Sequence, residues 1–145
     1  MIGGHTIGIG HCGAFTNRLY PTQDSTLKKS FAEDLYTTCP SNTSTNTAVL
    51  DIRTPNVFDN KYYVNLMHRE GLFTSDKDLY THSSTKEIVK EFANDQDLFF
   101  QKFALAMVKM SQLGVLTGSK GEIRNTCSSV NSASIDEVTA SEDEL

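Results

Sequence analysis

The sequence predicts a mainly α-helical domain over residues 1–131 and a disordered acidic extension over residues 132–145. Apolar side chains recur with a helical period of 3.6 in several stretches of the first 131 residues. The chain has 145 residues and is 38% hydrophobic, which is enough for one domain with a core. Residues 132–145 contain five acids and no Lys or Arg, a composition that favours a solvated tail.

The first half of the chain predicts one helix among turns and loops. Residues 1–13 are rich in glycine and predict a helix end or a turn. A helix is expected over Thr26–Thr38, and it ends before Pro40. A short extended segment follows at Ala48–Ile52, and Asp51–Asp59 form a loop.

The second half predicts three helices. Asp59 is placed to cap a helix that runs to about Glu70, with Gly71 as the left-handed residue after its end. Ser84 and Glu87 have the spacing of a capping box at the start of the next helix. A third helix runs from about Asp97 to Leu113, with several apolar residues spaced for burial, namely Phe99, Phe103, Ala106, Met107 and Met110. Glu122–Arg124 are expected to form a short strand.

Charge and cysteine content exclude some classes of function. The formal net charge is −5, but all of the imbalance lies in residues 132–145, so the body has no basic surface for nucleic acid. No apolar run is long enough for a transmembrane helix, and Met1–His5 do not have the pattern of a signal peptide. Three cysteines are an odd number, which in a secreted protein indicates a partner elsewhere. The sequon at Asn42 is weak support for a secretory route.

His5 lies in a glycine-rich run, Gly3–Gly8. Small neighbours would let its imidazole reach a flat ligand that approaches the backbone closely. A solvated or core histidine is the alternative interpretation.

Asp51–Asp59 place Asp51, Thr54 and Asp59 two or more positions apart on one loop. Oxygen donors with this spacing can surround Ca²⁺, which takes six to eight oxygen ligands. The alternative is an acidic turn in which Asp59 serves only as a helix cap.

Asp76 follows the apolar run Gly71–Phe73. One use for a buried carboxylate is to accept the ring N–H of a metal-ligating histidine. A surface acid in a turn is the alternative, and sequence spacing alone does not choose between the two.

The chain resembles the class III plant secretory haem peroxidases in five linked motifs that keep the family's order and cover residues 2 to about 131. The motifs are Gly3–Gly8 with His11-Cys12, Leu50–Pro55, Phe58–Tyr63, Gly71–Asp76, and the run from Phe103 through Gly114–Gly118 and Gly121–Arg124 to Cys127. The resemblance implies the C-terminal, proximal half of that family's helical fold.

The resemblance also implies roles for individual residues. His5 would be the axial ligand of the iron of haem b, and Asp76 the carboxylate bonded to its imidazole. The proximal Ca²⁺ would be bound by Thr6, Asp51, Thr54, the carbonyl of Val57, and Asp59. Cys12 and Cys39 would form a disulfide, whereas Cys127 would be unpaired because its partner belongs to the N-terminal half.

By this resemblance the function is the oxidation of phenolic donors by hydrogen peroxide, in a secreted or vacuolar enzyme with no nucleic-acid or membrane partner. The distal His and Arg of the family are absent, since His11, His68 and His82 lie outside any distal motif. The missing N-terminal half would therefore be this chain's partner. The alternative is a non-catalytic remnant that binds haem or calcium.

Overall fold

The computed structural model describes residues 2–131, and the mainly helical fold predicted from the sequence is confirmed. The chain divides into two compact units, Met1–Met110 and Ser111–Leu145. The predicted extension, residues 132–145, lies outside the described residues, so its boundary and its disorder stay predictions. Within residues 2–131, no helix combines the length and apolar character needed to cross a membrane.

The regular elements are short and are joined by turns. The α-helices are α1 (Lys29–Thr38), α2 (Lys61–Met67), α3 (Thr74–Thr81), α4 (Ser83–Asn94) and α5 (Gln96–Ser111). The strands are β1 (Ile9–His11) and β2 (Thr47–Val49), and the 3₁₀ helices are η1 (Ile2–Thr6), η2 (Cys12–Ala14), η3 (Thr16–Arg18) and η4 (Gly118–Lys120).

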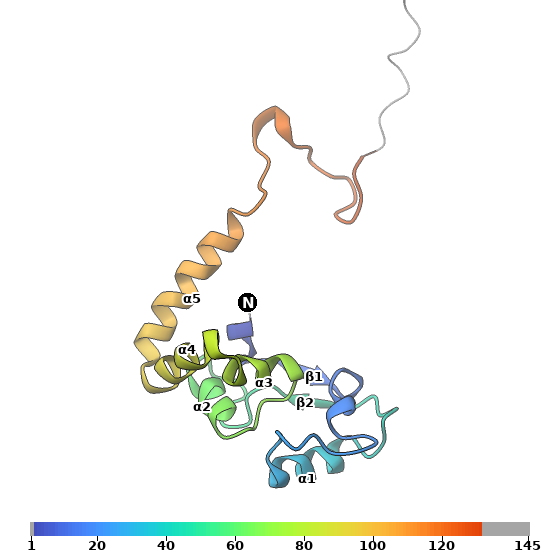
Figure 1. Ribbon diagram of the computed structural model, residues 1–145. Helices are drawn as coiled ribbons and strands as arrows, with labels where there is room; N and C mark the ends of the chain where they lie inside the picture. The colour runs from blue at the N-terminus through green and yellow to red at the C-terminus, as the bar shows by residue number, and fades with distance from the viewer. Residues whose placement is uncertain (1, 132–145) are drawn as a thin grey trace, which may run out of the picture. The chain divides into compact units, whose positions relative to one another are not determined.

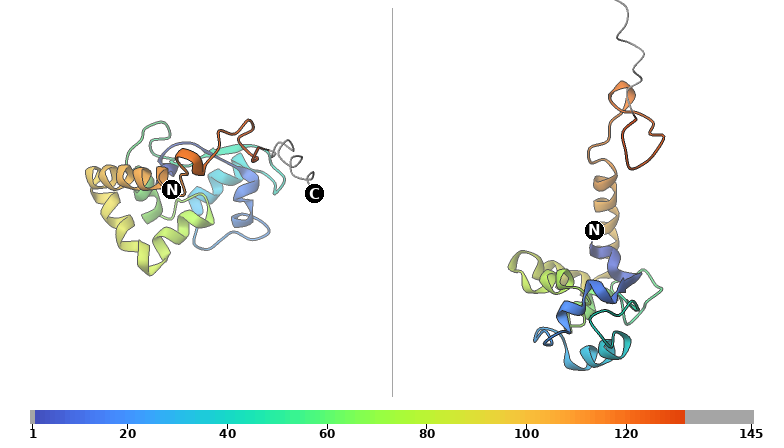
Figure 2. Two further views of the ribbon diagram at one scale, coloured as in Figure 1. Left: turned by 90° about the horizontal axis from the view of Figure 1, so that it is seen from above. Right: turned by 90° about the vertical axis from the view of Figure 1, so that its right-hand side faces the viewer.

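Helices α2, α3 and α4 gather at one end of the first unit (Figures 1 and 2). Their shared core contains Tyr62, Tyr63, Leu66, Val89 and Phe99. Tyr62 and Phe99 are almost completely buried, and rings from α2, α4 and the start of α5 meet edge to face around them. Aromatic burial therefore holds this end together.

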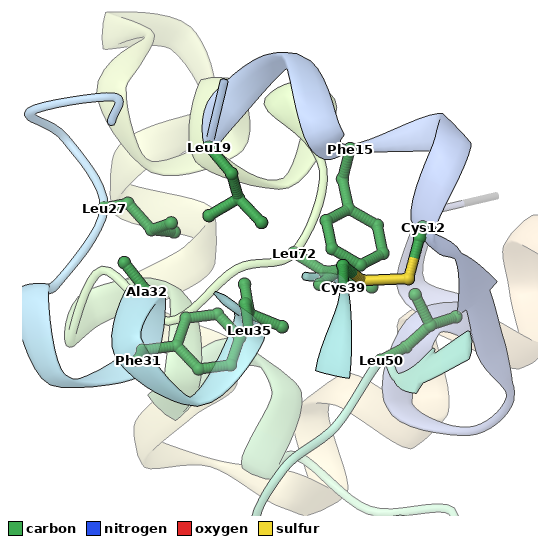
Figure 3. Close-up of a cluster of buried hydrophobic side chains, with 10 residues drawn as sticks. All are labelled: Cys12, Phe15, Leu19, Leu27, Phe31, Ala32, Leu35, Cys39, Leu50 and Leu72. Atoms are coloured by element: carbon green, nitrogen blue, oxygen red, sulfur yellow. A yellow bond between two sulfur atoms is a disulfide. The ribbon is translucent and has the colours of Figure 1, made fainter. Parts of the chain in front are cut away.

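Helix α1 and the strand pair form the other end of the first unit (Figure 1). Strands β1 and β2 are antiparallel, with Ile9 opposite Val49. Figure 3 shows the core here, in which the disulfide Cys12–Cys39 lies among Phe15, Leu35 and Leu72. Both cysteines are fully buried, and they are 27 residues apart in the sequence.

The boundaries of α2 depart from the expectation. Asn60 is the N-cap, and Asp59 instead accepts the backbone N–H of Lys61 through Oδ1 at 2.8 Å. The left-handed residue after the helix is Arg69, with φ of 61°, rather than Gly71. Gly71 is required for space, because a Cβ there would lie 2.8 Å from the side chains of both Leu66 and Asp76.

The expected capping box of Ser84 and Glu87 is wrong. Helix α4 begins at Ser83, and its N-cap is His82, whose ring accepts the N–H of Ser84. Helix α1 begins at Lys29, three positions later than expected.

Helix α5 begins one residue before and ends two residues before the expected bounds, and its burial is limited to its first turns. Phe99 is 1% exposed, whereas Leu105, Met107 and Val108 are 59%, 39% and 55% exposed. Helical periodicity predicts burial only where another element covers the face. The strand expected at Glu122–Arg124 is wrong, because no second strand pairs with it among the described residues.

In the second unit, residues 111–131 form turns around η4. Asn131 ties one turn together through hydrogen bonds with Glu122, Ile123 and Asn125. Cys127 is a free, exposed thiol.

Candidate functional site

His5 and Asp76 meet, although 71 positions separate them in the sequence. His5 lies in η1, and its Nδ1–H donates to Oδ1 of Asp76 at 2.8 Å. The Asp76 side chain is fully buried, whereas that of His5 is 26% exposed. A buried carboxylate needs such a donor, since burying an unpaired charge is costly.

Asp76 is also held by its own helix. It occupies the third position of α3, and its Oδ2 accepts the backbone N–H of Phe73 at 2.7 Å. An acid in the first turn satisfies an otherwise unpaired N–H and interacts favourably with the helix dipole. The hydrogen bond from the N–H of Phe73 therefore fixes the orientation of the Asp76 carboxylate, which accepts from His5.

Tyr62 of α2 supplies a third donor to Asp76. Its hydroxyl lies 2.6 Å from Oδ1, the oxygen that also accepts from His5. Burial raises the pKa of Tyr62 far above its ordinary value, and the charge of Asp76 and their hydrogen bond raise it further. Tyr62 is thus a neutral phenol that donates to the carboxylate.

Arg18 positions the segment that precedes α3. Its guanidinium is almost completely buried, and Nη1 donates to the carbonyls of Gly71, Leu72 and Phe73 at 2.6, 3.0 and 3.1 Å. Nε pairs with Asp24 at 3.0 Å. Burial raises the pKa of Asp24, but hydrogen bonds from Thr26 and Arg18 outweigh it and lower the pKa to about 2.

The other nitrogen of His5 is free to bind a ligand. Because Nδ1 carries the proton, Nε2 holds the lone pair, and it has no hydrogen bond within residues 2–131. The rings of Phe73 and Tyr62 stand edge-on to the imidazole at 5.5 and 5.8 Å between centroids. An oriented imidazole with one open nitrogen fits an axial ligand of haem iron.

Three residues of the predicted calcium loop, Asp51, Thr54 and Asp59, lie together with Thr6 of η1. Thr6 and Asp51 are fully buried, and Asp59 is 8% exposed. Thr54 Oγ1 lies 3.2 Å from Oδ2 of Asp51 and 3.1 Å from Oδ1 of Asp59. Thr6 Oγ1 donates to the Asp59 carbonyl at 2.6 Å.

The charges of this oxygen cluster fit a cation. The single hydroxyl proton of Thr54 can serve only one of its two carboxylate neighbours, and in the described part of the chain neither Asp51 nor Asp59 forms an ion pair with a Lys or Arg side chain. Two buried carboxylates without a counter-charge are unfavourable, and a hard cation would neutralise them.

Val57 joins this cluster through its backbone, by a hydrogen bond to Thr54. Its N–H donates to the Thr54 carbonyl at 3.1 Å, and its side chain is 52% exposed. Residues 2–131 contain no group of three or more His, Cys, Asp or Glu side chains arranged for a metal. The cluster has only two carboxylates and relies on hydroxyl and carbonyl oxygens.

The remaining histidines are engaged elsewhere. Nδ1 of His68 bonds the Val64 carbonyl in its own helix, and His82 caps α4. His11 is exposed on β1, opposite Thr47. Within the described residues, the hydrogen-bond and ring partners of His5 are Asp76, Tyr62 and Phe73 rather than any of these three histidines.

Sequence reasoning missed two residues of this site. Tyr62 lies within the predicted helix and the motif Phe58–Tyr63 but has no predicted role of its own, and Arg18 has none either. A buried tyrosine hydroxyl needs a partner, but the sequence does not reveal which one.

Comparisons with known proteins agree with the motifs. The family model described as peroxidase matches residues 1–95. The chain is 59% identical to Peroxidase 12 of Arabidopsis thaliana over 92% of its own length and 37% of that protein. It is 54% identical to the cationic peroxidase SPC4 of Sorghum bicolor, again over 92% and 37%. It is 45% identical to Peroxidase 2 of Hordeum vulgare, over 90% of this chain and 79% of that protein. The chain thus spans little more than a third of the first two relatives.

Proposed function

Since the chain belongs to the peroxidase family, we propose that it supplies the proximal haem ligand and the proximal calcium site of a haem peroxidase, a donor:hydrogen-peroxide oxidoreductase. The substrates proposed are hydrogen peroxide and small phenolic donors, with roles in peroxide catabolism and the response to oxidative stress. A secreted or vacuolar location follows from the same family. The chain spans 37% of the length of its first two relatives. Its peroxidase activity is therefore proposed together with the site.

The hydrogen bond between His5 and Asp76 carries this proposal. By accepting the hydrogen bond from Nδ1–H, Asp76 fixes the tautomer and the plane of the ring, so that the Nε2 lone pair is available to iron. Haem, when bound, supplies an iron centre that exchanges electrons with peroxide and the donor. The full burial of Asp76 excludes water that would compete for the His5 proton.

The proposed calcium ligands are Thr6, Asp51, Thr54, the carbonyl of Val57, and Asp59. Thr6 directly follows His5 in η1. A cation that binds the Thr6 hydroxyl would therefore restrain the backbone that carries the imidazole. This adjacency gives the ion a function in holding the haem ligand.

A second candidate is a non-catalytic chain that binds haem or calcium. Within residues 2–131, His68 bonds the Val64 carbonyl, His82 caps α4 and His11 lies on β1, so none of these histidines is paired with His5 to act as a second, proton-moving histidine. General acid–base catalysis requires such a group within hydrogen-bond reach. This candidate predicts haem binding without turnover.

A haemin titration tests the proposal. The wild-type chain is expected to show saturable changes in the Soret band, and His5→Ala is expected to lose the spectrum of a histidine-ligated iron. His68→Ala is the matched control, since His68 bonds only within its own helix and should leave the spectrum unchanged. Identical spectra for wild type and His5→Ala would remove His5 from the site. Turnover of a phenolic donor well above that of free haemin would exclude the non-catalytic candidate.

A further inference from the structure

One oxygen of Asp76 receives two side-chain donors. Nδ1 of His5 lies 2.8 Å from Oδ1, and the hydroxyl of Tyr62 lies 2.6 Å from the same atom. The second oxygen, Oδ2, is occupied by the backbone N–H of Phe73 at 2.7 Å. Tyr62 therefore competes directly with His5 for one acceptor.

Packing prevents the Tyr62 hydroxyl from turning away. The side chain is 0% exposed, and its ring packs edge to face against those of His5 and Tyr63 at 5.8 and 5.2 Å between centroids. A buried hydroxyl that left its acceptor would lose a charge-assisted hydrogen bond without gaining water. The donation to Asp76 is thus a fixed feature of the core shared by α2, α3 and α4.

Two donors on one oxygen weaken each other. Each donor stabilises part of the negative charge of the carboxylate, so that less charge remains to attract the other proton. The strength with which a carboxylate draws on the ring N–H of a metal-ligating histidine sets the basicity of the opposite nitrogen. A phenol on that carboxylate therefore reduces the basicity of the imidazole.

We propose that Tyr62 is a positioning residue that sets, through Asp76, how strongly His5 donates electrons to a bound metal. The inference rests on the proposed role of His5 as an axial ligand. Tyr62 of α2 thereby joins the pair of His5 in η1 and Asp76 in α3. With Tyr62 also bonded to Oδ1, His5 donates less electron density than it would as the only side-chain donor to that oxygen.

The first test needs no haem. Tyr62→Phe keeps the ring and removes the donor, so the His5 Nδ1–H proton should shift downfield in the NMR spectrum as its bond to Asp76 strengthens. Tyr63→Phe is the matched control, because this neighbour in α2 has no hydrogen bond from its hydroxyl within residues 2–131 and should leave the signal in place. An unchanged or upfield signal in Tyr62→Phe would overturn the inference, since a purely structural role would loosen the bond.

A second variant keeps the test decisive if Tyr62→Phe does not fold. Site-specific 3-fluorotyrosine at position 62 retains the hydroxyl and makes it a stronger donor. The His5 signal should then move upfield, opposite to the change in Tyr62→Phe. A downfield shift or no shift in the fluorinated protein would contradict the competition for Oδ1.

The haemin-loaded protein supplies an independent readout. A more basic imidazole stabilises the ferric state, so the reduction potential of Tyr62→Phe should be more negative than that of wild type, with Tyr63→Phe unchanged. If haemin binds through His5 but the potentials of Tyr62→Phe and wild type coincide, the inference fails and the proposed function stands. If His5→Ala does not alter haemin binding, the proposed function fails, and the NMR shift still decides whether Tyr62 competes with His5.

Discussion

Reduction of the Cys12–Cys39 disulfide is expected to lower the free energy of unfolding by about 3.5 kcal/mol. The bond closes a loop of 27 residues, and loop-closure entropy in the unfolded chain gives about this value at 25 °C. Reduction is cleaner than substitution because both buried sulfur atoms stay in the core, so no cavity opens around Phe15 and Leu72. The loss is a large fraction of the stability of a typical domain, which is about 5–15 kcal/mol.

Urea unfolding with and without a reductant measures this difference. A Cys127→Ser background prevents thiol exchange, and this substitution alone should leave stability unchanged because Cys127 is exposed and unpaired. The oxidised protein should also have the smaller m-value, since its unfolded chain exposes less surface. A difference below about 1 kcal/mol would refute the loop-entropy reasoning, because the value expected for this loop is several times larger.

Two further predictions concern single carboxylates. The pKa of Asp24 is lowered from 3.8 to about 2 by Thr26 and Arg18, so its contribution to stability is present above pH 3.8 and is lost as the pH falls through about 2. That loss is about 2 kcal/mol, and acid titrations of unfolding should show it in wild type but not in Asp24→Asn. For the proposed cation site, Ca²⁺ at a hundredfold excess over its Kd should stabilise the chain by about 2.7 kcal/mol in thermal melts, and a chelator should reverse this. Asp51→Asn should abolish the calcium effect and the exposed Asp34→Asn should retain it, whereas a calcium response that survives in Asp51→Asn would exclude this loop.

The helices with strong apolar periodicity were predictable, and the weakly patterned one was not. Apolar residues repeat at helical spacing in three stretches, and each stretch overlaps an observed helix. The stretches are Thr26–Thr38, Asp59–Glu70 and Asp97–Leu113. Helix α3 was missed because Thr74–Thr81 are mostly polar and only Asp76 is buried. Its helical state depends on the hydrogen bonds at its first turn, which sequence patterns do not reveal.

The candidate site shows the same limit. Sequence motifs brought His5, Asp76 and the calcium loop into one hypothesis, and the structure places His5 beside Asp76. They did not reveal the shared oxygen of Asp76, because the position of Tyr62 depends on how α2 packs against α3. Arg18 escaped notice for a similar reason, since its three carbonyl partners are more than 50 positions away in the sequence.

The two oxygens of Asp76 have a consequence for mutagenesis. Oδ1 serves His5 and Oδ2 anchors the first turn of α3, so any replacement of this side chain alters an electronic influence and a helix start in a single step. Asp76→Asn would replace one carboxylate oxygen with an NH₂ group. The N–H groups of this amide would then face a hydrogen-bond donor that the oxygen had accepted from. A loss of function in Asp76→Asn would have two causes at once, a frayed start of α3 and an altered hydrogen bond to His5. Tyr62→Phe keeps the hydrogen bond between Oδ2 of Asp76 and the N–H of Phe73, so its effect reports on His5 alone.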